Sequence, residues 1–183
     1  MPVGVQVLLN DWRASLAIGK TVGAQFIRMD FFVDRVRIKA GIIEPAPEAV
    51  LAYRRQIKAE GVALFTDIQV KYSELLEEGK SLSASARQAI AHGADALIVT
   101  GKATGDSPPV EQVREAREAA GEFPVLIGSG LTAHNAPELL RYADGAIVGT
   151  AFKQSMAAHE RVVVERVQAL MGAVRAIRQG RSG

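Results

Sequence analysis

Six short runs rich in Val, Ile and Leu recur along the chain, and each is followed by a stretch whose apolar residues repeat with a helical period. This alternation is typical of parallel strands joined by crossover helices. No Ser/Pro-rich linker or low-complexity insert interrupts the 183 residues, so we expect one domain over residues 1–178 and a flexible tail over residues 179–183. The expected strands lie near residues 3–9, 26–31, 62–68, 94–100, 124–127 and 145–148, and the expected helices near residues 12–23, 47–60, 81–92, 108–120, 135–142 and 157–178.

Polar and apolar residues alternate within the early strands. Arg28 and Asp30 share one parity in the second expected strand, and Asp67, Gln69 and Lys71 share one in and after the third. Alternate residues of a barrel strand face the lumen or the surrounding helices, and polar side chains belong in the lumen near its C-terminal mouth. Because a helix follows every strand, we predict an α/β fold: a TIM-type (β/α)8 barrel of which the chain holds six βα units, equivalent to strands 3–8.

The last two strands each end at a glycine-rich turn. Gly128, Ser129 and Gly130 follow the fifth strand, and Gly149 and Thr150 follow the sixth. The loops after the last two strands of such barrels commonly bind a substrate phosphate, because glycines let backbone N–H groups approach an anion. We therefore predict that these five residues bind the phosphate of a small phosphorylated ligand. The alternative is that they are tight turns without a ligand.

Two further segments extend this predicted binding site. Thr100, Gly101 and Thr104 lie in a strand-end loop that superficially resembles a P-loop, but its lysine precedes the second glycine, so it is not a nucleoside triphosphatase motif. We expect this loop to form a wall of the substrate site, with a flexible lid as the alternative. Lys153, just beyond the last glycine turn, is expected to add positive charge beside the anion.

Asp67 and Lys71 are the first candidates for catalysis, because they lie four residues apart at a strand end and on the same face. A carboxylate and an ammonium group converging on a phosphosugar can act as base and acid, and the lysine can also stabilise an enolate. A lysine with a pKa lowered by burial can instead form a Schiff base. The structural alternative is an inward ion pair that closes the top of the barrel.

Asn10 and Asp30 complete the candidate catalytic set. Asn10 and Asp11 follow the first strand directly, where they can bind hydroxyl groups or a magnesium-type cation, although the same pair is common in turns. Arg28 and Asp30 are both expected inside the lumen. They can form a buried ion pair rather than contact a substrate, and for Arg28 we favour this structural role.

Composition excludes several classes of protein. The chain has no cysteine, which excludes disulfides, thiolate metal sites and cysteine nucleophiles. Its net charge of +2 comes from scattered bases, so no nucleic-acid partner is expected. No apolar run approaches the roughly 20 residues that cross a bilayer, and we expect a cytoplasmic location. His92, His134 and His159 lie far apart, so we predict neither a metal site nor a cofactor, while leaving room for a divalent cation.

The motifs together resemble the BtpA/SgcQ family. The resemblance runs from about Val3 to the final helix and is carried by residues 5–11, 26–28, 41–44, 53–55, 67–71 with Ser73, 94–101 with Thr104 and Gly105, 128–130, and 143–150 with Lys153.

This resemblance implies a TIM-type barrel related to phosphate-binding barrels. Family members in phototrophs are associated with photosystem I biogenesis at the thylakoid, and relatives elsewhere resemble sugar or nucleoside metabolism proteins. Tyr72 stands where the family pattern implies a histidine, which excludes imidazole catalysis at that position. The family is longer at its N-terminus, so this chain begins where the third strand would lie.

Two functions are therefore expected as alternatives. The first is an enzyme acting on a phosphorylated sugar, nucleoside or related metabolite by acid/base chemistry. The second is a non-catalytic assembly or regulatory factor for a membrane complex, peripheral to the thylakoid in a phototroph. Six strands also leave two open sheet edges, and such edges can pair with a strand of another chain. We favour a start that is truncated relative to a longer protein, with homo-oligomerisation through those edges as the alternative.

Overall fold

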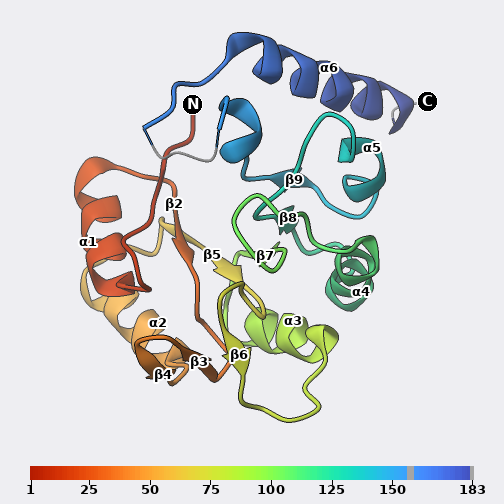
Figure 1. Ribbon diagram of the computed structural model, residues 1–183. Coiled ribbons are helices and arrows are strands. Elements are labelled where there is room, and N and C mark those ends of the chain that lie inside the picture. The colour runs from red at the N-terminus through yellow and green to blue at the C-terminus, as the bar shows by residue number, and fades with distance from the viewer. Residues whose placement is uncertain (156–158, 182–183) are drawn as a thin grey trace.

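A sheet of six parallel strands, curled into a half-barrel, forms the centre of the molecule (Figure 1). The computed structural model describes residues 1–155 and 159–181. Buried side chains such as Ile27, Leu64 and Leu97 pack between the sheet and its helices. The prediction of six parallel strands in a partial (β/α) barrel is thus confirmed. In spatial order the strands are β1 (Gly4–Val5), β2 (Phe26–Met29), β5 (Ala63–Asp67), β7 (Ala96–Val99), β8 (Val125–Ile127) and β9 (Gly145–Ala146).

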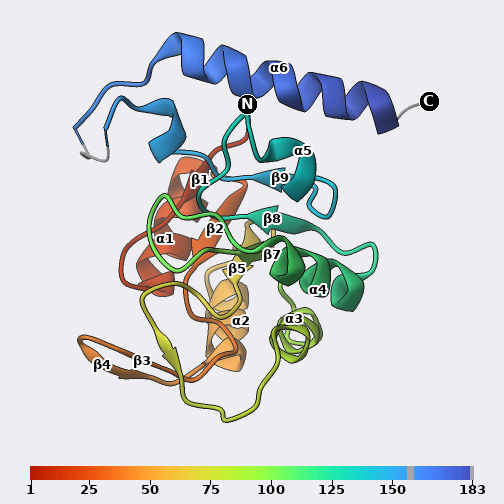
Figure 2. The same ribbon diagram turned by 45° about the vertical axis from the view of Figure 1, so that its right-hand side comes forward.

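Helices connect successive strands of this sheet, as Figure 2 shows. Each longer helix buries an apolar stripe, with Leu16, Val50, Ala86 and Val113 at most 1% exposed. These four residues belong to one hydrophobic core, so burial of the sheet's outer face holds the helices in place. The helices are α1 (Trp12–Val22), α2 (Pro47–Gln56), α3 (Leu82–Ala91), α4 (Val110–Ala120) and α5 (Ala136–Leu139).

The last helix, α6 (Val164–Arg181), begins later than expected. Residue 157, the expected start, lies outside the described residues. Residues 160–163 are not helical, because Val162 forms an isolated bridge with Lys153. The helix also continues past residue 178. It contacts α5, and its Leu170 side chain is buried. Across residues 1–155 and 159–181, no helix combines the length and the hydrophobicity needed to cross a membrane.

A second, three-stranded antiparallel sheet was not predicted from the sequence. It consists of β3 (Val36–Ile38), β4 (Gly41–Ile43) and β6 (Glu74–Leu75). Val36 lies opposite both Ile43 and Leu75, and it packs in a small separate core with Phe31 and Val70. The segments that follow β2 and β5 are thereby joined beyond the ends of those strands.

The first strand is shorter than the predicted range 3–9, because the chain leaves the sheet after Val5. The Asn10 amide takes over the contact with the segment after β2: its Nδ2 donates to the Phe31 carbonyl at 2.8 Å and its Oδ1 accepts from the Phe31 N–H at 3.1 Å. The Val7 N–H donates to Ser15 Oγ in α1 at 3.0 Å. Side-chain hydrogen bonds therefore replace the expected strand ladder.

A buried ion pair joins β2 to β5 on the concave face of the sheet. Arg28 Nε and Nη2 donate to the two Asp67 carboxylate oxygens at 2.8 and 2.7 Å, and the side chains are 14% and 0% exposed. The predicted pair of Arg28 with Asp30 is therefore wrong. Arg28 lies opposite Phe65, so Asp67 is its diagonal neighbour on the same face. Asp30 instead accepts from Gln6 Nε2 at 2.8 Å.

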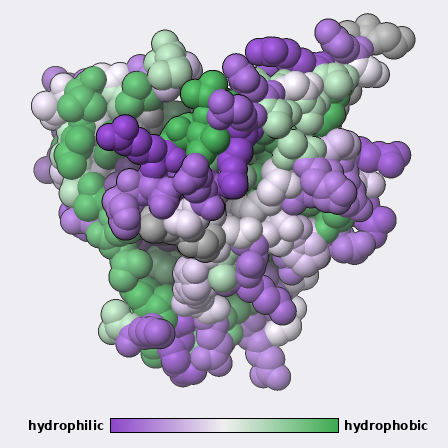
Figure 3. Space-filling model, turned by 45° about the horizontal axis from the view of Figure 1, so that its top comes forward, coloured by the Kyte–Doolittle hydropathy of each residue, from purple (hydrophilic) through white to green (hydrophobic). Residues whose placement is uncertain are grey.

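The edge of the sheet at β1 carries exposed apolar residues. Val3, Leu8 and Leu9 are more than half exposed, as is Val22 in α1. Apolar surface gathers on the α1 side, at the left of Figure 3. Pairing of this edge with another chain stays a prediction.

Replacing Asp67 alone leaves the Arg28 guanidinium buried without a counter-charge. We expect the free energy of unfolding of Asp67→Leu to fall by about 3 to 5 kcal/mol. The double variant Arg28→Met/Asp67→Leu removes both charges while keeping apolar volume, and it should regain most of that loss. Urea unfolding at pH 7 measures both effects. A double variant as unstable as Asp67→Leu would contradict this explanation.

Candidate functional site

Both glycine turns line one cavity of about 460 Å³ at the C-terminal ends of the strands. Such a volume falls within the range of small-molecule sites. The structure thus brings together seven of the residues predicted to form the site, from loops that lie far apart in sequence. They are Lys71, Thr104, Gly128, Ser129, Gly130, Gly149 and Thr150.

Close packing explains the glycines of the first turn. A Cβ on Gly128 would lie 2.5 Å from Ile98 Cγ2, and one on Gly130 would lie 2.1 Å from the Ser107 nitrogen. Gly130 also has φ +69°, a left-handed conformation that favours glycine. The turn is therefore pressed against the strand and loop of β7, and Ser129 Oγ adds a hydrogen bond to the Asp106 carbonyl at 2.8 Å.

Gly149 has no such packing requirement. A Cβ built there meets no atom within 4 Å, and its φ of −126° is accessible to other residues. Among the described residues, the N–H groups of Gly149, Thr150 and Ala151 make no backbone or side-chain hydrogen bond. This backbone lines the cavity without a side chain in front of it, which is what close approach of an anion requires.

Lys71 lies at the mouth of the barrel because the chain turns sharply after β5. Gln69 has φ +46°, and the Lys71 N–H donates to Thr100 Oγ1 at 3.2 Å. The described residues give Lys71 no ion-pair partner. Its ammonium group is therefore available to a ligand in the cavity that it lines.

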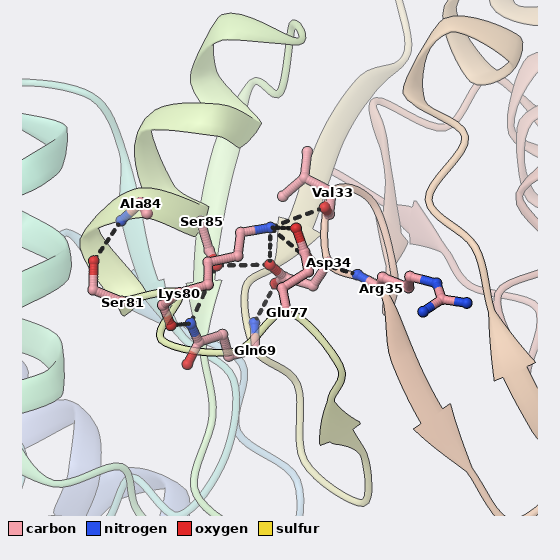
Figure 4. Close-up of polar contacts among 9 residues, drawn as sticks. All are labelled: Val33, Asp34, Arg35, Gln69, Glu77, Lys80, Ser81, Ala84 and Ser85. Atoms are coloured by element: carbon pink, nitrogen blue, oxygen red, sulfur yellow. Dashed lines mark hydrogen bonds and ion pairs between the residues drawn. The ribbon is translucent and has the colours of Figure 1, made fainter.

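A buried polar cluster fastens this turn, as Figure 4 shows. Asp34 Oδ2 accepts from the Gln69 N–H at 2.7 Å, and its Oδ1 accepts from Ser85 Oγ at 2.6 Å. Lys80 Nζ pairs with Asp34 at 2.8 Å and with Glu77 at 2.9 Å, and its side chain is only 10% exposed. The cluster thus ties three segments together, one of which leads into Lys71. Sequence reasoning missed it, because its members lie far apart along the chain.

Asp67 does not form the inward ion pair with Lys71 that was the structural alternative to a catalytic role. Its carboxylate binds Arg28 and lies fully buried below the cavity rather than in its lining. Burial raises the pKa of Asp67 to about 6, and the hydrogen bonds from Arg28 oppose this rise. Arg28 in turn lies beneath the first glycine turn, since a Cβ on Gly128 would be 3.1 Å from its Nη2. Asp67 is therefore placed to act on the site through Arg28.

Two other predicted catalytic residues lie outside the cavity lining. Asn10 uses its amide on the Phe31 backbone, and Asp30 binds Gln6. Asp11 accepts from the Ala14 N–H at 2.9 Å and caps α1. The turn interpretation of Asn10 and Asp11 accounts for these contacts. Within residues 1–155 and 159–181, no three His, Cys, Asp or Glu residues cluster as a metal site would need.

The remaining predicted binding residues lie around the same mouth. Thr100 and Gly101 line a second, adjoining cavity, and a Cβ on Gly101 would lie 2.3 Å from the Asp106 carbonyl oxygen. Lys153 is not among the lining residues; its N–H donates to the Thr150 carbonyl at 3.0 Å. Asp106, which sequence reasoning did not single out, lines both cavities. Its position in a loop without periodicity gave no signal.

We expect the Asp67 carboxyl to titrate with a midpoint near pH 6, measured from its carbon chemical shift by NMR. The titrating carboxyl resonance should be absent from the spectrum of the Asp67→Asn variant. Because this pKa lies above the ordinary 3.8, the folded state holds the proton more tightly than the unfolded chain. A midpoint near the ordinary value would contradict the effect of burial.

Sequence comparisons connect the chain to known proteins. A model described as the BtpA family matches residues 1–176. The photosystem I biogenesis protein BtpA of Synechocystis is 36% identical over 94% of this chain and 60% of its own length. An uncharacterized mitochondrial protein of Caenorhabditis elegans is 40% identical over 82% of this chain and 54% of its own length. The chain thus spans between half and two thirds of the length of these relatives.

Solved structures confirm the fold. Phosphoribosyl anthranilate isomerase from Thermus thermophilus has a TM-score of 0.62 and 15% identity, covering 91% of this chain and 68% of that protein. Thiamine phosphate pyrophosphorylase from Pyrococcus furiosus has a TM-score of 0.58 and 19% identity, covering 88% of this chain and 65% of that protein. At such identities the likeness concerns the fold alone, a partial barrel of the TIM type.

Proposed function

The chain belongs to the BtpA family, and we propose that its site binds the phosphate of a small phosphorylated metabolite and acts on that metabolite as an enzyme. One observation carries this proposal: the two glycine turns and Lys71 line a single cavity. The free backbone at Gly149, which packing does not explain, supports it. The names of the structural neighbours, phosphoribosyl anthranilate isomerase and thiamine phosphate pyrophosphorylase, also refer to phosphorylated compounds.

The chemistry proposed for this site is acid/base or electrostatic. Lys71 can donate a proton or stabilise negative charge that develops on a substrate oxygen. Asp106 lines the same cavity, and its carboxylate is the partner that we propose for Lys71. Asp67 has a positioning role, because its buried pair holds the Arg28 guanidinium beneath Gly128. A substrate phosphate at the glycine turns would thus lie in the same cavity as both reacting groups.

A second candidate function is assembly of a membrane complex. It is favoured by the 36% identity with the protein named for photosystem I biogenesis. In this proposal phosphate binding is a regulatory signal, and the location is peripheral to a membrane. Affinity purification of the tagged protein from membrane and soluble fractions of its source would test it: co-purification with a membrane complex supports assembly, and recovery without one contradicts it. The cytoplasmic location inferred from the sequence stays a prediction.

We expect Gly149→Ala to weaken binding of glycerol 3-phosphate about tenfold, because a Cβ stands where the anion approaches the backbone. Stability should stay within about 0.5 kcal/mol of the parent protein, since the Cβ meets no protein atom. Isothermal titration calorimetry and urea unfolding measure the two quantities.

Gly172→Ala is the matched control, because a Cβ on Gly172 in α6 also meets no atom within 4 Å. Its affinity for glycerol 3-phosphate should equal that of the parent protein. Absence of binding by the parent protein, or equal affinity in Gly149→Ala, would contradict the proposed site.

A further inference from the structure

A second cavity, of about 890 Å³, adjoins the one lined by the glycine turns. Lys71 and Asp106 line both cavities, so the two lie side by side. The larger cavity lies between the segment of β3 and β6 and the loop after β7. The proposed phosphate site occupies only the smaller cavity, which leaves the larger one without an assigned ligand.

The charges that line the larger cavity are mainly positive. The charge of Arg37 is compensated by an ion pair, in which its Nη1 lies 2.8 Å from Glu74 Oε2. Lys39, Lys71 and Lys102 line the cavity without an ion-pair partner among the described residues. The only other lining carboxylate is that of Asp106. The lining therefore holds three lysines and one aspartate that form no ion pair among the described residues.

The three lysines come from separate parts of the fold. Lys39 lies at the turn between β3 and β4, Lys71 follows β5, and Lys102 is in the loop after β7. Lysines scattered over a surface are simply solvated, but three that line one concavity raise the local concentration of anions. The hydroxyl of Tyr72, which lines this cavity, accepts from the Thr104 N–H at 2.7 Å and joins two of these loops.

We propose that the larger cavity binds a second anionic group of the same ligand, so that the substrate class is a phosphorylated metabolite with a second phosphate or carboxylate. The inference rests on the proposed function, because the first phosphate must occupy the glycine turns. Lys71, which lines both cavities, lies between the two anionic ends. Lys39 and Lys102 bind the second end and thereby select doubly charged ligands over singly charged ones.

Synthetic ligands of one and two charges test this proposal. Straight-chain alkanediol bisphosphates of three to six carbons would be compared with the matching monophosphates by isothermal titration calorimetry. We expect at least one bisphosphate to bind at least tenfold more tightly than its monophosphate. Lys39→Gln and Lys102→Gln should each reduce this gain, leaving the affinity for the monophosphate within about twofold. The chain length that binds best gives the spacing of the two anionic ends.

Lys20→Gln is the matched control, because Lys20 is an exposed lysine in the last turn of α1 and lines neither cavity. It should keep the full gain for the bisphosphate. A bisphosphate that binds no more tightly than its monophosphate, or a gain that survives in both Lys39→Gln and Lys102→Gln, would overturn this inference while leaving the proposed phosphate site intact. If neither ligand binds, the proposed function itself is wrong.

Discussion

The buried ion pair between Arg28 and Asp67 is the contact on which the mouth of the half-barrel depends. It joins β2 to β5 on the concave face and places a guanidinium directly below the first glycine turn after β8. Both hydrogen bonds of the pair are short, and both side chains are largely buried. Because a buried charge without its partner is costly, β2 and β5 must keep this register whenever the site is formed. Gly128 then fits only as glycine, since Ile98, Thr100 and Arg28 occupy the space of a side chain.

The loops above this pair are held by contacts between distant parts of the chain. The cluster of Asp34, Gln69 and Lys80 fixes the turn that carries Lys71, and Thr100 accepts from the Lys71 N–H. The loop after β7 packs against Gly130, so the two walls of the cavity support one another. Gly149 differs from Gly128 and Gly130 of the first turn, because a Cβ on Gly149 would meet no atom within 4 Å. The site therefore combines a rigid wall with an exposed segment of backbone at which an anion can bind.

Much of the fold could be predicted from the sequence, because hydrophobic periodicity marks a strand and its helix locally. The same reasoning predicted that both glycine turns and Lys71 lie at the C-terminal mouth of the barrel, since the ends of parallel strands meet there. It failed for contacts that depend on neighbouring strands. Arg28 pairs across to Asp67 rather than along its own strand to Asp30, and β6 pairs with β3 over a long separation in sequence. Residues 6–9 were expected in a strand, yet the Asn10 amide replaces the ladder there.

The central claim is that an anion binds to the backbone at the second glycine turn, opposite the first. The most direct measurement is the change in backbone amide chemical shifts as inorganic phosphate is added to isotopically labelled protein. Saturable shifts of Gly149, Thr150 and Ala151, together with Ser129 and Gly130, are predicted, with Gly172 unchanged. Shifts that never saturate, or that appear only at exposed lysines away from both turns, would contradict the claim.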